Sequence, residues 1–121
     1  MRAAGAGAVT GDAITVRDAV LDLLRRFGMT SIFGNPGSTE LPLLRNLPGD
    51  FRYVLGLQEA VVVGKADGYA QATRNAAFVN LHSAAGVGHA MGNIFTAHKN
   101  RTPLKSSWTA RQRSGTASAN W

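Results

Sequence analysis

Helix-like and strand-like patterns alternate along this chain of 121 residues, and this alternation constrains the fold more than any other feature of the sequence. Apolar residues spaced three and four apart mark helices, and short continuous apolar runs between turn residues mark strands. We expect helices over residues 15–28, 38–47, 59–74 and 89–100, and strands over residues 30–34, 51–56 and 76–81. The alternation favours a parallel sheet with right-handed crossovers. The sequence therefore predicts an α/β fold, a three-layer open parallel sheet with helices on both faces.

The two ends of the chain differ from this pattern. Residues 1–12 form a weakly apolar Ala/Gly run that makes a poor signal peptide, so we expect a flexible extension there. Pro103 and Leu104 resemble the entry to a fourth strand, but residues 105–121 have no helical or strand period and are mostly Ser, Thr, Ala, Arg and Gly. That composition indicates disorder. We expect one domain over residues 13–104, with a sheet that is incomplete at its C-terminal end.

The formal net charge of +6 at first suggests a nucleic-acid partner. Lys105, Arg111 and Arg113 carry half of this excess, however, and no acidic residue accompanies them in residues 105–121. The rest of the chain lacks a basic face interleaved with aromatic residues, so we expect no nucleic-acid binding. The absence of cysteine excludes disulfides and thiolate metal sites and is compatible with the cytoplasm. No apolar stretch approaches the roughly 18–20 residues that span a bilayer, so we expect no membrane segment.

Three loops follow the expected strands, at residues 35–39, 58–59 and 82–88. In open α/β sheets, ligands bind beyond the carboxyl ends of the strands, where these loops gather. The common phosphate-binding patterns are absent: Met91 stands where a dinucleotide fingerprint would need a third Gly or Ala, and Gly64-Lys65 is followed by Ala66. Any site on this rim must therefore use other chemistry.

Three polar residues on this rim are candidates for that chemistry, and each has a structural and a functional interpretation. Glu59 is either an acidic residue favoured by a helix N-terminus or a partly desolvated carboxyl with a raised pKa. His82 either caps a strand end or takes part in a site, and Ser38 is either a helix N-cap or a ligand-binding hydroxyl. His89 and His98 are nine residues apart, which at about 100° per residue places them on opposite helix faces. With so few ligands we expect no metal site.

The segments "FGNPGSTELPLL", "FRYVLGLQEAVVVGKADGYAQAT" and "AAFVNLHSAAGVGHAMGN" carry a specific resemblance because all three agree in order and spacing. Together they resemble the N-terminal, pyrimidine-binding domain of thiamine-diphosphate-dependent 2-oxo-acid decarboxylases. The resemblance covers about residues 14–104. Within the family, His82 followed by Ser-Ala-Ala-Gly points to the benzoylformate decarboxylase branch. An acetolactate-synthase-like carboligase is the alternative within the same cofactor class.

The resemblance implies roles for five residues. Glu59 corresponds to the glutamate that hydrogen-bonds the aminopyrimidine ring of thiamine diphosphate and so promotes removal of the thiazolium proton. Pro36 and Gly37 correspond to the turn that lies against the pyrimidine. Ser38 corresponds to the serine that holds the substrate carboxylate. His82 corresponds to the histidine that transfers protons around the decarboxylated intermediate.

Family enzymes are several times longer than this chain and act as homo-oligomers on small 2-oxo acids. The resemblance implies that the complete enzyme decarboxylates an aryl 2-oxo acid to an aldehyde without oxidation. It also implies that a domain absent from this chain binds the diphosphate through Mg2+. We therefore expect the chain to be inactive alone, and the loss of pattern after Leu104 to reflect a truncated or out-of-frame product. A further alternative is a non-catalytic module that pairs with a separate diphosphate-binding subunit.

Overall fold

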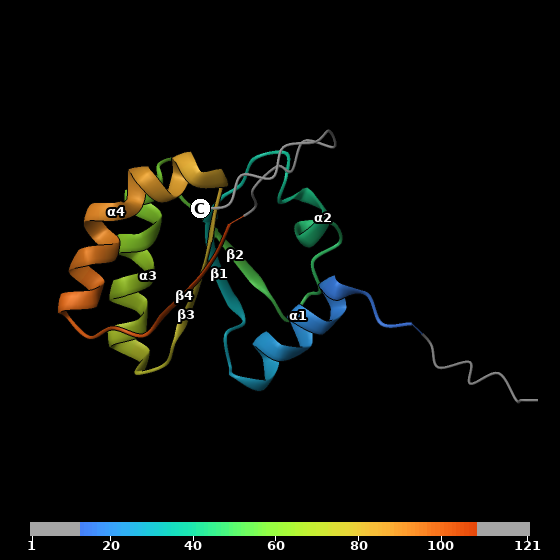
Figure 1. The fold of residues 1–121 in the computed structure, drawn as a ribbon. Coiled ribbons are helices and arrows are strands. Elements are labelled where there is room, and N and C mark those ends of the chain that lie inside the picture. The colour runs from blue at the N-terminus through green and yellow to red at the C-terminus, as the bar shows by residue number, and fades with distance from the viewer. Residues whose placement is uncertain (1–12, 109–121) are drawn as a thin grey trace, which may run out of the picture.

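The computed structural model describes residues 13–108 as four parallel strands and four helices (Figure 1). In chain order the elements are α1 (Val16–Arg26), β1 (Ser31–Asn35), α2 (Leu41–Leu44), β2 (Arg52–Leu55), α3 (Glu59–Thr73), β3 (Ala77–Leu81), α4 (Ser83–Lys99) and β4 (Leu104–Trp108). The strand order in the sheet is β2-β1-β3-β4, and every pair is parallel. The parallel α/β sheet expected from the sequence is confirmed.

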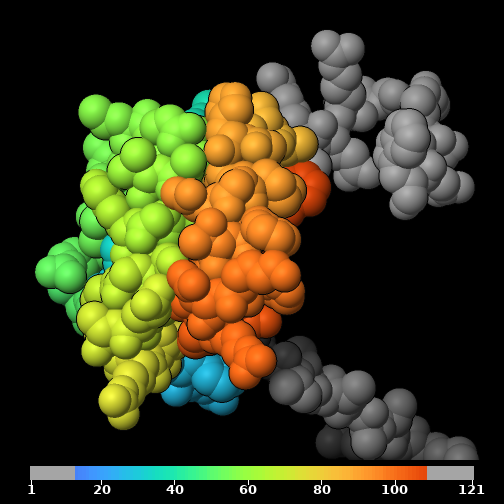
Figure 2. All heavy atoms as spheres, turned by 90° about the vertical axis from the view of Figure 1, so that its left-hand side faces the viewer, coloured from blue at the N-terminus to red at the C-terminus, as the bar shows by residue number. Residues whose placement is uncertain are grey.

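Helices cover both faces of the sheet. Helices α3 and α4 lie on one face, and α1 and α2 lie on the other (Figure 1). Figure 2 shows α3 and α4 side by side across their face. The two apolar clusters follow this division: Phe33 and Val79 pack with α3 and α4, whereas Ile32 and Phe78 pack with α1. The predicted three-layer architecture is therefore confirmed.

The central strands β1 and β3 are buried because helices cover both of their faces. All five residues of β3 are buried, and so are the first four of β1. A strand covered on both faces has a nearly continuous apolar run, which these two segments have in the sequence. Pro36, Gly37, Ser38 and His82 follow the carboxyl ends of this buried pair, and Glu59 follows the neighbouring strand β2.

Helix α1 begins and ends where its sequence signals predict. The Thr15 hydroxyl accepts a hydrogen bond from the Asp18 backbone N–H at 3.1 Å, which satisfies one of the free donors at the helix start. Gly28 follows the C-cap residue Phe27 with a φ of 67°, a conformation that glycine adopts without strain. Arg17 donates to the backbone carbonyls of Leu43, Arg45 and Asn46, which ties α1 to the end of α2.

Helices α2 and α4 differ from their predicted bounds. Helix α2 has only four residues, with Pro42 in its first turn and a positive φ at Asn46 soon after its end. Its N-cap residue is Glu40, so the structural interpretation of Ser38 as an N-cap is wrong. Residues 83–88, expected as a loop, form the first turns of α4. The sequence did not predict this part of the helix because Gly86 and Gly88 have low helix propensity.

The expectation that disorder begins at residue 105 is wrong for its first four residues, because Leu104–Trp108 forms β4 beside β3. The strand is held by backbone pairing with β3, which needs no apolar pattern in its own side chains. Lys105 and Ser106 are exposed. The rest of the predicted tail, residues 109–121, and the predicted extension, residues 1–12, lie outside the described part of the chain. Within residues 13–108, no helix is long and apolar enough to cross a bilayer.

Candidate functional site

All five predicted site residues lie where the sheet meets the turn after β1 and the first residues of α3 and α4. Pro36, Gly37 and Ser38 follow β1 directly, Glu59 is the first residue of α3, and His82 is the N-cap of α4. Because β1 and β3 are parallel neighbours, the turn after β1 meets the end of β3. The turn contacts His82 through Gly37 and Thr39, and Asn35, the last residue of β1, contacts Glu59.

His82 is fixed by a buried carboxylate that the sequence did not single out. Its Nδ1 lies 2.8 Å from Oε2 of Glu40 and 3.3 Å from the hydroxyl of Thr39. The same Glu40 oxygen accepts the backbone N–H of Gly37 at 2.8 Å, and its other oxygen accepts the Thr39 hydroxyl at 2.6 Å. Glu40 is only 2% exposed. It therefore holds the turn after β1 and the His82 ring in one arrangement.

Gly37 lies directly against the face of His82. An ideal Cβ built at this position would be 2.2 Å from Cε1 and 2.3 Å from Nδ1 of the His82 ring. Only glycine fits so close to the imidazole without moving it. The spacing of His82 and the turn is thus set by the absence of a side chain at residue 37.

Tyr53 in β2 lies near Glu40. Burial, reinforced by the negative charge of Glu40, raises the pKa of the Tyr53 hydroxyl to about 12. Its oxygen would lie 2.0 Å from a Cβ built at Gly34, so β1 also needs glycine at that position. The neutral phenol is strongly favoured in this place.

Glu59 is buried to 8% exposure at the start of α3. Asn35 in β1 donates its side-chain amide to Oε1 of Glu59 at 3.3 Å, and Nδ1 of His89 in α4 lies 3.4 Å from Oε2. Gly86 packs against the same side chain, since a Cβ there would be 3.2 Å from Cγ of Glu59. Three elements thus converge on one carboxyl: β1, α3 and α4.

The pKa of Glu59 is shifted in the direction opposite to the one the functional interpretation required. Burial of the carboxyl raises its pKa, but the backbone N–H of Glu59 and the side chains of His89 and Asn35 together outweigh burial and hold the pKa below its usual value. Of the two interpretations of Glu59, the one that gave its carboxyl a raised pKa is therefore wrong. Sequence could not show this, because His89 and Asn35 come from other elements.

Ser38 lies apart from these two groups. It is exposed in the turn between β1 and α2, whereas Gly37 on one side and Thr39 on the other are only partly exposed. The structure therefore brings Gly37 and His82 together, connects Glu59 to the end of β1 through Asn35, and leaves Ser38 open to solvent. Among residues 13–108, no group of three His, Asp or Glu side chains gathers in the manner of a metal site.

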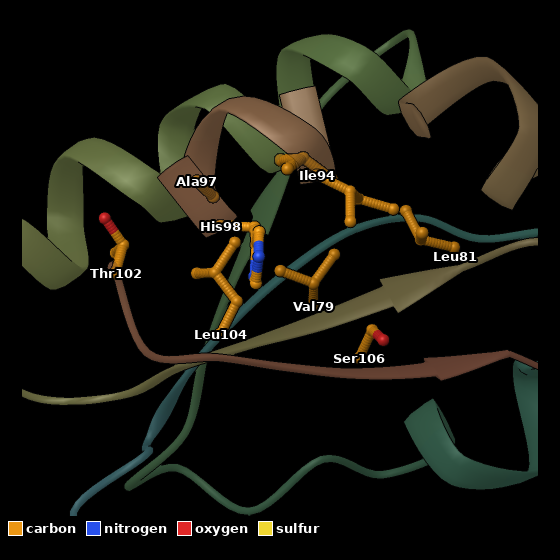
Figure 3. Close-up of a pocket in the computed structure, with 9 residues that line it drawn as sticks. Val79, Leu81, Ile94, Ala97, His98, Thr102, Leu104 and Ser106 are labelled. Atoms are coloured by element: carbon orange, nitrogen blue, oxygen red, sulfur yellow. The ribbon is translucent and has the colours of Figure 1, made fainter. Parts of the chain in front are cut away.

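A separate cavity of about 220 Å³ lies between α4 and the strands β3 and β4 (Figure 3). Its lining is mainly apolar, with Val79, Leu81, Ile94 and Leu104, and His98 is also among the residues that line it. None of the five predicted site residues lines this cavity. It lies on the face of the sheet that α4 covers and is distinct from the Glu59 and His82 groups.

Comparison with known proteins agrees with the resemblance found in the sequence. The family model described as "Thiamine pyrophosphate enzyme, N-terminal TPP binding domain" matches residues 14–106. Benzoylformate decarboxylase from Pseudomonas aeruginosa is 56% identical over 90 residues, which make up 74% of this chain and 17% of that protein.

Two solved structures share the fold. Benzoylformate decarboxylase from Polynucleobacter necessarius superposes with a TM-score of 0.79 at 48% identity, covering 82% of this chain and 19% of that one. The thiamine diphosphate-dependent 4-hydroxybenzoylformate decarboxylase of Rhodococcus jostii RHA1 gives a TM-score of 0.80 at 48% identity, covering 84% of this chain and 19% of that one. This chain thus spans less than a fifth of the relatives it matches. It belongs to the thiamine pyrophosphate enzyme family and corresponds to the N-terminal TPP-binding domain of benzoylformate-decarboxylase-like members.

Proposed function

We propose that this chain supplies the pyrimidine-binding side of a thiamine diphosphate site in a benzoylformate-decarboxylase-like enzyme. The observation that carries the proposal is the Glu59 carboxyl, which is largely buried at the start of α3 and held by side chains from β1 and α4. An ionised carboxyl of this kind accepts a strong hydrogen bond from a protonated ring nitrogen. The family match over residues 14–106 supports the same assignment.

The residues present fit the pyrimidine end of the cofactor. Glu59 would hold a ring nitrogen through its carboxyl, and Pro36 and Gly37 would form the wall of the turn beside it. The bound cofactor would supply the electron sink for decarboxylation. We assign the diphosphate and its Mg2+ to protein segments outside this chain, and we expect a homo-oligomer in which such segments face this domain.

His82 would act on the substrate rather than on the pyrimidine. Glu40 lies at its Nδ1 and orients the ring, so Nε2 is the atom that would accept or return a proton. Ser38, exposed in the turn directly after Gly37, would donate its hydroxyl to the carboxylate of the 2-oxo acid. We propose an aryl 2-oxo acid as the substrate and the corresponding aldehyde as the product, formed in the cytoplasm.

Thiamine, which has the pyrimidine but no diphosphate, tests the proposal on the full 121-residue chain. Titration of 15N-labelled protein with millimolar thiamine should shift the backbone amides of Asn35, Gly37 and Glu59. Glu59→Gln should weaken this binding about tenfold, because a neutral amide accepts a hydrogen bond from a protonated ring nitrogen less strongly than a carboxylate does. Asp22→Asn is the control, since Asp22 lies in α1 and makes an exposed ion pair with Arg26. Equal thiamine affinity in wild type and Glu59→Gln would refute the assignment.

A further inference from the structure

His89 was excluded as a metal ligand from its spacing in the sequence, and the resemblance to the family gives it no role. It lies in the second turn of α4, and its Nδ1 is 3.4 Å from Oε2 of Glu59. We propose that His89 is a positioning residue whose imidazole fixes the orientation and the proton occupancy of the Glu59 carboxyl. Its relevance to thiamine diphosphate rests on the proposed function, but the contact itself needs no cofactor.

The packing of α4 on α3 delivers His89 to this place. Gly86, His89 and Asn93 follow one another at helical spacing along α4 and all contact the first turn of α3. Gly86 lies against the Glu59 side chain, and the Asn93 side-chain amide donates to the carbonyl of Ala60. Contacts before and after His89 along the helix therefore hold its backbone at a fixed distance from the carboxyl.

The two partners differ sharply in exposure. The side chain of His89 is 65% exposed, whereas that of Glu59 is 11% exposed. Solvent can therefore hydrate and protonate the imidazole, while the carboxyl depends on protein donors for its stabilisation. Nδ1 reaches Glu59 as a donor either in the imidazolium or in the neutral ring that carries its proton on Nδ1.

Few other side chains compete with His89 as donors to the Glu59 carboxyl. The side-chain donors to Glu59 within the described residues are Asn35 from β1, which does not titrate, and His89 from α4. Burial raises the pKa of Glu59, but the Glu59 backbone N–H, the His89 side chain and the Asn35 amide together lower it. Protonated His89 thus keeps Glu59 ionised, and loss of the His89 proton weakens that preference.

The test follows the side-chain carboxyl carbon of Glu59 by NMR as a function of pH in the full 121-residue chain without cofactor. His89→Ala removes both the donor and the charge, so Glu59 should titrate at a higher pH than in wild type. His89→Asn keeps a donor near the position of Nδ1 but cannot be charged, so its Glu59 midpoint should fall between the other two. His98→Asn is the matched control on the same helix and should leave the Glu59 midpoint unchanged.

A second readout uses the wild-type protein alone. The Glu59 carboxyl carbon should report a second, smaller step that coincides with titration of the His89 ring. The inference would be overturned if the Glu59 midpoint were unchanged in both His89 variants. If a variant fails to fold, the absence of the second step in the wild-type protein would overturn it. The Glu59 midpoints could shift as expected while Glu59→Gln leaves thiamine affinity unchanged. In that case the role of His89 stands and the proposed function fails.

Discussion

Replacing Gly37 by alanine should displace His82 and destabilise the protein measurably. The added Cβ would lie 2.2 to 2.6 Å from three atoms of the imidazole, so the ring must retreat by about 1 Å to reach the 3.4 Å at which ordinary contact begins. The His82 ring has room for this movement, since 40% of its side chain is exposed to solvent. The ring should therefore swing toward solvent rather than force the backbone apart.

That movement breaks the 2.8 Å contact between His82 Nδ1 and Glu40 Oε2. A hydrogen bond to a charged group contributes about 1.5–3 kcal/mol, and crowding a packed site costs about 1–3 kcal/mol when it cannot relax. Because the ring can relax and Glu40 keeps the Gly37 N–H and the Thr39 hydroxyl as donors, we expect a loss of about 1–3 kcal/mol in the free energy of unfolding.

Urea unfolding of the full chain, followed by circular dichroism, measures this loss. Gly49→Ala is the matched control because a Cβ at Gly49 meets nothing within 4 Å, so its unfolding free energy should change by less than about 0.5 kcal/mol. The ring signals of His82 should shift in Gly37→Ala and stay in place in Gly49→Ala. Equal stability of the two variants would show that Gly37 does not set the position of His82.

Two further predictions concern α4 and β2. Gly92→Ala should raise the free energy of unfolding by about 0.8–1 kcal/mol, because Gly92 lies inside α4 with nothing near its added Cβ; a loss of stability in urea would contradict this. Tyr53 has a folded pKa of about 12 against an ordinary value of 10.0, so the unfolded state loses its proton first and stability should fall as pH rises from about 10 to about 12. Tyr53→Phe should flatten that fall in denaturant titrations, and an equally steep fall in the variant would refute the assignment.

The elements that could be predicted from sequence are those whose causes are local. Thr15 and Gly28 mark the ends of α1 because a cap and a left-handed residue act on their own neighbours. The apolar runs of β1 and β3 follow from burial on both faces. Strand β4 was not predicted because its three central residues are polar and its order comes from pairing with β3, which is a contact between distant segments.

The candidate site shows the same division. Glu59, His82 and the turn at Gly37 could be found because each follows a strand that the pattern predicts. Glu40 was missed, since nothing in its neighbours indicates that it would be buried against a histidine 42 residues later. The direction of the Glu59 pKa shift also depends on contacts from β1 and α4 that the chain makes only when folded.

The strand order β2-β1-β3-β4 has a consequence for how the protein is made. The central pair joins Ile32 to Phe78, so a segment of nearly fifty residues must be closed before the middle of the sheet exists. Closing such a segment loses chain entropy before the strand pairing can stabilise it, which slows folding. On the ribosome, the first half of the chain must therefore wait, with β1 paired at most on one side, until β3 has emerged from the exit tunnel. Chaperones that bind exposed apolar segments can act on this half of the chain until β3 emerges.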